Sequence, residues 1–349
     1  MYKLTSMKKI VYFLSIVALL FSCTSQDTEF DDFEYQTVYF PFQTPVRSIV
    51  LGDEVLGDNT IDLEHAFSIG ATFGGAYNNV KDRVLTVRLA PELASNITDA
   101  SGNEIELLPD EYYTATFDKI IIPAGSFSGK MRVNLADAFF TDPLSTGVHY
   151  IVPVLITDAA GDSVLSGEPI VDFPDRRIPE HWEIPPKDYV LFGIKYINET
   201  HGVYLLRGQK INTTSTPPRT VSYSARFLDD NDQVKLSTKS LTESYMPTIG
   251  GTSKESADAK YSMILAFNES NNDVTVSQKD SSTVTVSGTG KYYTKDEPGS
   301  ESYNGARHRT IYLDYTYEDA DSVYQVKDTL VFIDTDLRFE EFDVIVVNP

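Results

Sequence analysis

Short runs of alternating apolar and polar residues recur along most of the chain, and they constrain its fold more than any other feature. VLTVRLAP, from Val84 to Pro91, alternates in this way, and YTATFDKIIIPAG, from Tyr113 to Gly125, contains a similar run. Such alternation indicates a half-buried β-strand, and clusters of Pro, Gly and Asp between the runs leave little room for helices. The sequence therefore predicts an all-β protein, with one short helical turn near Leu135 to Phe140.

A proline-rich segment divides this pattern into two halves. FPDRRIPEHWEIPP, residues 173–186, contains four prolines, which disfavour both a continuous helix and a central strand. We therefore predict a first domain at 35–172, a linker at 173–186 and a second domain at 187–349. A chain of 349 residues has room for two domains at ~100–200 residues each.

The two halves predict different β-architectures. The first half contains about seven short strands, which favour an antiparallel sandwich. The second half contains about eight or more, which favour an antiparallel barrel or a second sandwich. Within RTIYLDYTYE, the side chains of Ile311, Leu313, Tyr315 and Tyr317 fall on one face of a strand.

The N-terminus has the charged and apolar regions of a secretory signal. Lys3, Lys8 and Lys9 precede an apolar run from Ile10 to Phe21, which is too short for a membrane span of ~20 residues. The run leads into Leu-Phe-Ser-Cys, which resembles a bacterial lipobox, where the cysteine thiol is diacylated and becomes the new N-terminus. We therefore predict a lipoprotein signal peptide at residues 1–22.

Cys23 is the only cysteine, so no disulfide can form within one chain. We predict that its thiol carries the lipid; the alternative is a free or buried cysteine at this position. The residues that follow, TSQDTEFDDFEYQ, are polar and acidic without apolar periodicity, which predicts a flexible tether at 23–34. Packing should begin near Tyr35 to Phe42.

The formal net charge of −22 argues against nucleic acid as a partner, because the protein would repel phosphate. Motifs for catalysis are also missing from the sequence, which has no G-x-S-x-G, S-x-x-K or H-E-x-x-H. The five histidines are scattered. We therefore predict no catalytic residue, no metal and no cofactor.

Three weaker motifs have structural interpretations. SGTGKYY, residues 287–293, superficially resembles a phosphate loop but fits a glycine-containing strand better. DDND, residues 229–232, could bind calcium but lacks the features of an EF-hand loop, so a hairpin turn is favoured. Glu340 and Glu341 could be imagined as a glycosidase pair, but neighbours in a strand point to opposite faces.

Trp182, the only tryptophan, has two interpretations. It could stack on a sugar ring, or it could fill the interface between the two domains. We favour the second interpretation.

Several longer segments carry a resemblance to a known group of proteins. In the first half they are VYF at 38–40, LPDEYYTATFDKIIIPAGSFSGKMRVNL and HYIVPVLITDAAGDSVLSG. In the second half they are DYVLFGIKYINETHGVYLLRG, VSGTGKYY, RTIYLDYTYED and KDTLVFIDTDLRFEEF. The chain resembles two-domain outer-membrane lipoproteins of Bacteroidetes polysaccharide-utilisation loci. Its first domain is similar to the one that precedes the catalytic barrel in surface endo-β-N-acetylglucosaminidases.

This resemblance implies an immunoglobulin-like sandwich followed by a barrel-like domain, with a lipocalin-like barrel as one form. It implies a lipid-anchored protein on the outside of the outer membrane that captures glycans, such as host N-glycans or other complex oligosaccharides, for a TonB-dependent transporter. The tether also resembles the acidic signal that exports such lipoproteins to the cell surface.

The resemblance supplies no binding residues, so the candidates come from the sequence. Five flank or lie within the longest polar loop of the second domain, and the sixth is the lone tryptophan: Tyr292, Tyr293, Tyr303, Asn304, Arg307 and Trp182. Aromatic faces can stack on sugar C–H groups, while polar side chains bind hydroxyls. The main hypothesis is a non-catalytic glycan-binding lipoprotein. The alternatives are an adhesin or structural surface protein, and a small β-fold enzyme that acts on glycosides.

Overall fold

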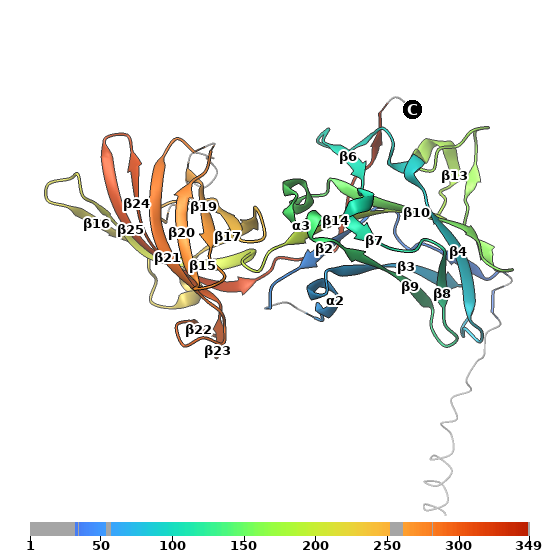
Figure 1. Cartoon of the computed structure of the whole chain (residues 1–349), viewed down its shortest axis with the longest axis horizontal. Coiled ribbons are helices and arrows are strands. Elements are labelled where there is room, and N and C mark those ends of the chain that lie inside the picture. Colours follow the sequence, from blue (N-terminus) through green and yellow to red (C-terminus); the bar gives the residue numbers. More distant parts are fainter. Residues whose placement is uncertain (1–31, 34, 54–56, 252–260, 281, 348–349) are drawn as a thin grey trace, which may run out of the picture.

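The computed structural model describes residues 32–347, apart from 34, 54–56, 252–260 and 281. Two β-rich domains lie side by side (Figure 1), and the chain crosses between them twice, once after Ile197 and again before Glu340. The predicted all-β fold is confirmed. No described helix is long and apolar enough to cross a membrane.

The first domain contains two short α-helices and most of the short strands. Its elements are β1 (Thr37–Tyr39), β2 (Pro45–Val50), α2 (Thr60–Leu63), β3 (Ala66–Gly74), β4 (Arg83–Leu89), β5 (Ile97–Thr98), β6 (Glu104–Leu107), β7 (Tyr113–Thr114), β8 (Lys119–Ile122), β9 (Ser128–Leu135), α3 (Asp137–Thr141), β10 (Tyr150–Asp158), β11 (Ser163–Val164), β12 (Glu168–Pro169), β13 (Trp182–Ile184), β14 (Tyr189–Ile197), β26 (Glu340–Glu341) and β27 (Ile345–Val346). The helical turn expected near residues 135–140 is α3.

Two sheets stack face to face in this domain. One has the order β11-β1-β3-β9-β7, and the other has the order β26-β2-β14-β10-β6-β5-β27, with β4 paired to β10 and β8 paired to β4. Buried side chains from both sheets, including Phe67, Val133, Leu85, Val152 and Ile194, form one core between them. The domain is therefore a sandwich, but β1–β11, β2–β14 and β6–β10 are parallel pairs, so its sheets are mixed where the prediction was purely antiparallel.

A second apolar layer covers the outer face of the larger sheet. Ile151 and Leu191 belong to this layer, and they pack in one cluster with Leu93 and with Phe342 from the end of the chain. β26 pairs with β2 and β27 pairs with β5 on either side of Phe342. The C-terminal segment thus returns to complete the first domain.

The domain boundary differs from the one expected at residues 173–186. β14 follows that segment, yet it pairs with β10 and β2 in the first domain's larger sheet. Its sequence YVLFGIKYI is nearly all apolar because this central strand is buried on both faces. The first domain therefore extends to Ile197 and takes back the C-terminal strands.

The second domain is a barrel between those two parts of the chain. Its strands are β15 (Gly202–Asn212), β16 (Arg219–Ser222), β17 (Asp232–Thr238), β18 (Glu243–Met246), β19 (Met263–Phe267), β20 (Asp273–Gln278), β21 (Thr285–Tyr293), β22 (Glu301–Tyr303), β23 (Ala306–His308), β24 (Thr310–Asp319) and β25 (Ser322–Asp334). Antiparallel pairing runs from β15 through β17–β21 to β24 and β25, and β25 pairs back to β15. The predicted antiparallel barrel is confirmed.

The barrel interior is filled with side chains. Ile311, Leu313, Tyr315 and Tyr317 of β24 are all buried, as their alternation predicts. On β21, Gly288 and Gly290 face these side chains: an added Cβ at Gly288 would collide with Tyr315, and one at Gly290 would lie 2.8 Å from Leu313 Cδ2. The glycines of SGTGKYY therefore belong to a strand, as predicted.

DDND does not form a hairpin turn. Leu228–Asp230 is a 3₁₀ turn, and the strands on either side of it, β16 and β17, pair with different stretches of β15 and not with each other. The side chain of Asn231 organises this turn through hydrogen bonds with the backbone of residues 225, 227 and 228. Within the described part of the chain, no three His, Cys, Asp or Glu side chains are grouped to hold a metal ion.

Candidate functional site

A pocket of about 270 Å³ opens at one end of the barrel, where the chain enters from the first domain. We call it the mouth pocket. It is lined by the β14–β15 connection, the ends of β19 and β21, and the turns beside them: Glu199, Thr200, Leu241, Thr242, Phe267, Asn268, Glu269, Asn272, Tyr292 and Thr294. The mouths of β-barrels are common ligand sites.

Two aromatic rings form the apolar part of the mouth pocket. Phe267 ends β19 and Tyr292 lies near the end of β21, with ring centroids 5.8 Å apart and planes nearly perpendicular. Tyr292 is buried, and its hydroxyl donates a 2.8 Å hydrogen bond to Glu199 Oε1. Burial and the nearby Glu199 carboxylate raise the pKa of Tyr292 well above its usual value, so its hydroxyl stays protonated as a donor.

The rim of the mouth pocket is built from a hydrogen-bonded turn. Asn268 Oδ1 accepts bonds from the backbone and hydroxyl of Ser270, and Asn272 has a left-handed backbone with φ of 59°. Asn272 also donates a 3.0 Å bond to Glu297 Oε1, while Glu297 Oε2 accepts from Thr294 N at 2.7 Å. These bonds fix the rim before any ligand arrives, which lowers the entropic cost of binding.

Contacts at the junction between the two domains hold the end of the barrel that contains the mouth pocket. Arg309, only 1% exposed, donates to the carbonyl oxygen of Glu199 and lies 3.7 Å over the ring of Phe332. Lys295 Nζ lies 3.5 Å from the carboxylate of Asp53 in the first domain. Glu199 is therefore held in place from both its side chain and its backbone.

A second, more open concavity of about 750 Å³ lies on the outer wall over β20, β21, β24 and β25. Short side chains such as Thr275, Thr289 and Thr329 lie among its lining residues. Its charged groups are paired across strands, with Lys291 Nζ 2.6 Å from Asp273 and Lys327 Nζ 3.2 Å from Asp314. It has one aromatic lining residue, Tyr312, whose hydroxyl lies 3.1 Å from Glu301 Oε1 and 3.2 Å from the carbonyl oxygen of Gly299.

Of the six candidate binding residues, Tyr292 alone lines the mouth pocket. Tyr293, the next residue of the strand, packs on Tyr312 and Gly299 instead. Tyr303 and Asn304 lie in the β22–β23 hairpin, where Asn304 has φ of 50°, and Arg307 donates to the carbonyl of Glu297 at 3.0 Å. The hairpin residues therefore do not line the mouth pocket, and Arg307 contacts only Glu297 of its rim.

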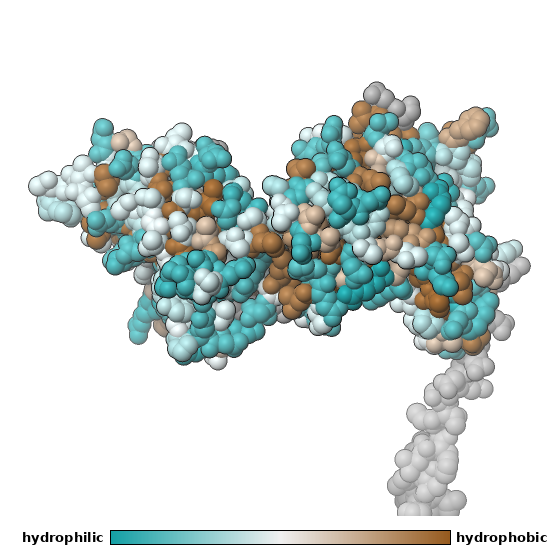
Figure 2. Space-filling view, viewed as in Figure 1, coloured by the Kyte–Doolittle hydropathy of each residue, from teal (hydrophilic) through white to brown (hydrophobic). Residues whose placement is uncertain are grey.

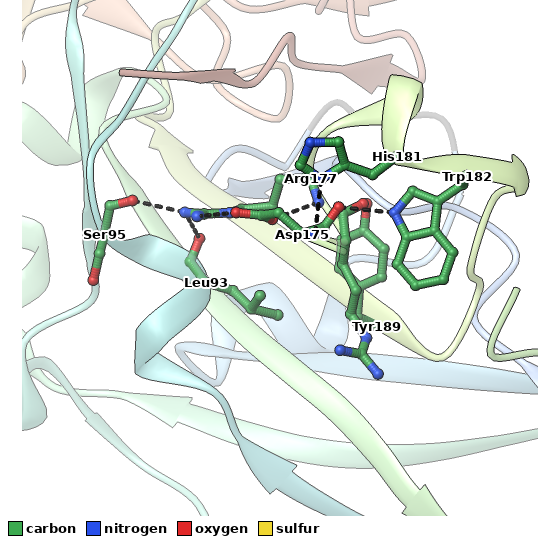
Figure 3. A network of polar contacts seen from close by, with 8 residues as sticks. Leu93, Ser95, Asp175, Arg177, His181, Trp182 and Tyr189 are labelled. Carbon is green, nitrogen blue, oxygen red and sulfur yellow. Dashed lines mark hydrogen bonds and ion pairs between the residues drawn. The ribbon is translucent and has the colours of Figure 1, made fainter. Parts of the chain in front are cut away.

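Trp182 does not lie between the domains. Its Nε1 donates a 2.8 Å hydrogen bond to the carbonyl of Asp175, and its strand β13 pairs with β12 at the far side of the first domain (Figures 1 and 3). Arg177 fixes this segment by binding the Asp175 carboxylate and the carbonyls of Leu93 and Ser95. The hydrogen bonds that Arg177 donates to the carboxylate lower the pKa of Asp175. The proline-rich segment is therefore part of the first domain, and the interdomain position predicted for Trp182 is wrong.

Three parts of the mouth pocket were not predicted from the sequence: Phe267, Glu199 and the polar turn at residues 268–272 between β19 and β20. The signal was the segment FNESNND at 267–273, where an aromatic residue ends a strand and a turn rich in amides and carboxylates follows. Cys23 and the signal peptide lie outside the described residues.

Comparisons with known proteins identify both domains. Residues 199–336 match the family described as a domain of unknown function, DUF5627, and residues 33–163 match a model described as an N-terminal domain. A crystal structure of a Bacteroides ovatus protein of unknown function is 33% identical, with a TM-score of 0.79, and the match covers 91% of this chain and 100% of that one. The chain belongs to the same two-domain family. No curated protein matches it.

Two other solved structures are more distant. One, also a Bacteroides ovatus protein of unknown function, is 14% identical with a TM-score of 0.44 and covers 88% of this chain and 99% of that one. The other, described as an auxiliary nutrient binding protein from Bacteroides thetaiotaomicron, is 14% identical with a TM-score of 0.37 and covers 82% and 89%.

Proposed function

We propose that this family member is a non-catalytic, lipid-anchored surface protein that binds a glycan in the mouth pocket. The observation that carries the proposal is the combination of the Phe267 ring with the Glu199 carboxylate on one rigid rim. An aromatic face offers a surface for sugar C–H groups, while carboxylates and amides accept and donate hydrogen bonds to hydroxyls. The pocket volume of about 270 Å³ admits a terminal sugar and not a whole chain.

The lipobox and acidic tether support the anchoring part of the proposal. A diacylated Cys23 would hold the protein at the outer face of the outer membrane, because two acyl chains give stable attachment. From that position the protein would pass captured oligosaccharides to a neighbouring TonB-dependent transporter. Mass spectrometry of the N-terminal peptide from native membranes tests the lipid, and co-purification from those membranes tests the transporter.

Glycan binding is tested by screening the chain from Cys23 onward against host N-glycans, mucin glycans and plant polysaccharides, followed by calorimetry on the ligands found. Glu199→Gln keeps the shape of the side chain and its acceptor for Tyr292 but removes the charge. We expect it to weaken binding roughly tenfold, as loss of a charged hydrogen bond does. Glu180→Gln, on the 3₁₀ turn beside Trp182, is the matched control. If no glycan in the panel binds, the proposal fails.

The presence of two carboxylates in the mouth pocket, Glu199 and Glu269, makes glycoside hydrolysis the second candidate. The same glycans are therefore incubated with the protein and assayed for new reducing ends. The proposed binding role predicts none. Release of reducing ends that Glu199→Gln abolishes would instead establish an enzyme.

A further inference from the structure

Exposed apolar side chains gather at one corner of the first domain, where the described chain begins. They come from three segments: residues 33–35, the β3–β4 loop and the β8–β9 loop. Val80 is 83% exposed and Phe33 is 73% exposed, and the other exposed members are Tyr35, Tyr77 and Phe127. We call these five residues the apolar corner. In Figure 2, brown apolar residues lie at the lower right of the first domain.

Direct contacts show that the three segments are contiguous. Phe33 N donates to the carbonyl of Gly75 at 3.1 Å, and Tyr77 N donates to the carboxylate of Asp32 at 2.7 Å. The side-chain amide of Asn79 donates to the carbonyls of Pro123 and Ser126 at 2.9 and 2.8 Å. The start of the described chain is therefore bonded to one loop, and that loop is bonded to the next.

The corner is held by a buried cation. Arg83, 3% exposed, lies 3.4 Å over the ring of Phe73 and donates to Asn79 at 2.9 Å and to Gln36 at 2.8 Å. It also forms an ion pair with Asp162. Phe73 in turn stacks on Phe127, with ring centroids 6.0 Å apart. The exposed apolar residues are thus presented by a fixed surface.

The described charged groups of these loops are bound to the protein itself. Besides Asp32, the carboxylate of Asp82 accepts a 2.8 Å bond from Ala124 N, and Lys81 Nζ lies 3.5 Å from Asp162. The surface that these loops offer is therefore mainly apolar and aromatic. Such residues are favoured at the interface between lipid and water.

We infer that the apolar corner rests on the lipid surface to which the chain is anchored. This inference depends on the lipid attachment proposed above. Asp32 is the ninth residue after Cys23, so even a fully extended tether would hold the corner within roughly 30 Å of the membrane. Contact with an uncharged lipid surface would bury the five side chains and orient the molecule with this corner against the membrane. The net charge of −22 disfavours an anionic surface.

The sole cysteine allows a direct test that does not rely on natural lipidation. The chain from Cys23 onward is coupled through its thiol to maleimide lipid in phosphatidylcholine vesicles, and hydrogen exchange is compared with the same protein free in solution. We expect amide exchange at residues 75–82 and 123–127 to slow several-fold on the vesicles. Exchange at residues 166–173, which carry the equally exposed Ile170 and Phe173, should not change.

Two double variants distinguish contact of the apolar corner with the lipid surface from tethering alone. Val80→Ser with Phe127→Ser should abolish the slowing, whereas Ile170→Ser with Phe173→Ser should preserve it. Unchanged exchange at 75–82 and 123–127 in the tethered parent would overturn the inference, as would equal slowing at 166–173. Glycan binding, measured on the same vesicles, reports on the mouth pocket independently, so that failure of the proposed binding function is distinguishable from failure of this inference.

Discussion

Tyr315 donates a 2.7 Å hydrogen bond to Asp328 Oδ2 in the interior of the barrel, while its oxygen accepts a 2.8 Å bond from Gly250 N. Tyr223 donates to the other carboxylate oxygen. The Asp328 carboxylate is 2% exposed. Through these hydrogen bonds it links β25 to β24 and to the two loops that contain Tyr223 and Gly250. Burial outweighs the two hydroxyl donors and raises the pKa of Asp328 to about 6.

Because the pKa of Asp328 is raised in the folded protein, stability should fall as pH rises through this carboxyl's titration. Between about pH 4 and pH 6 the folded protein keeps the Asp328 proton while the unfolded chain has lost it, so unfolding becomes easier as pH rises across this window. Across this window Asp328 should lower the free energy of unfolding by roughly 1.4 kcal/mol per pH unit, or about 3 kcal/mol in all. Asp328→Asn, whose amide oxygen can accept from one tyrosine while its NH₂ group donates to the oxygen of the other, should lack this pH dependence.

Denaturant unfolding of the parent and of Asp328→Asn at pH 4, 5, 6 and 7 gives the difference between their free energies of unfolding. The other carboxylates contribute equally to both proteins, so their effects cancel in this difference. The variant should gain stability relative to the parent as pH rises to 6, then remain level. Asp314→Asn, on the exposed outer wall of the same barrel, is the control. A difference that does not change with pH would contradict the assignment to Asp328.

Close packing against Gly288 gives a second prediction. Because an added Cβ would collide with the backbone and Cβ of Tyr315, the β21 and β24 strands would have to separate in Gly288→Ala. Overpacking of this kind costs about 1–3 kcal/mol of unfolding free energy. At Gly147 nothing lies within 4 Å of an added Cβ, so Gly147→Ala should change stability by less than about 0.5 kcal/mol. Thermal unfolding followed by tyrosine near-ultraviolet circular dichroism measures both variants.

The single tryptophan allows the first domain to be followed separately, since Trp182 lies in that domain. Phe342 packs against Gly193, where an added Cβ would lie 3.1 Å from the phenyl ring. Phe342→Ala should therefore destabilise the transition seen by Trp182 fluorescence by about 3 kcal/mol, as other buried Phe truncations do. Phe339→Ala, three residues earlier and 62% exposed, should cost clearly less. Equal effects of the two variants would mean that the C-terminal segment does not complete the first domain.

The contrast between local and long-range pairing explains what the sequence could predict. Alternation in β24 predicted which side chains fill the barrel, because that pattern depends only on neighbouring residues. The predicted domain boundary is wrong at β14, because both faces of this strand are buried and its sequence therefore does not alternate. It is also wrong at β26, because the partner strand β2 lies almost 300 residues away in the sequence. The mouth pocket depends on barrel closure, which brings Glu199 beside Tyr292. The sequence pattern alone predicted Tyr292 as a candidate binding residue, but it did not predict Glu199 or Phe267, which face it.

Binding in the mouth pocket provides a prediction that separates ring stacking from simple burial. Phe267→Leu keeps an apolar side chain against the barrel core but removes the flat face. Since aromatic stacking contributes about 0.5–1.5 kcal/mol, affinity for any glycan found should fall roughly twofold to tenfold. Phe227→Leu, an exposed aromatic away from the mouth pocket, should leave affinity unchanged. Isothermal calorimetry measures both, and an unaffected Phe267→Leu would place the glycan elsewhere.

Arg83 contributes three properties at once to the corner of the first domain: a planar cation over Phe73, donors to Asn79 and Gln36, and an ion pair with Asp162. A lysine keeps the charge but has neither the plane nor donors in three fixed directions. Because the side chains of Asn79 and Gln36 would lose their donors while Asp162 keeps a nearby charge, Arg83→Lys should cost about 2–3 kcal/mol in the transition followed by Trp182. Arg132→Lys, whose exposed ion pair with Glu64 is 2.7 Å long, should cost less than about 1 kcal/mol. If Arg83→Lys were as mild as this control, the corner would be held by its backbone hydrogen bonds and not by the buried cation.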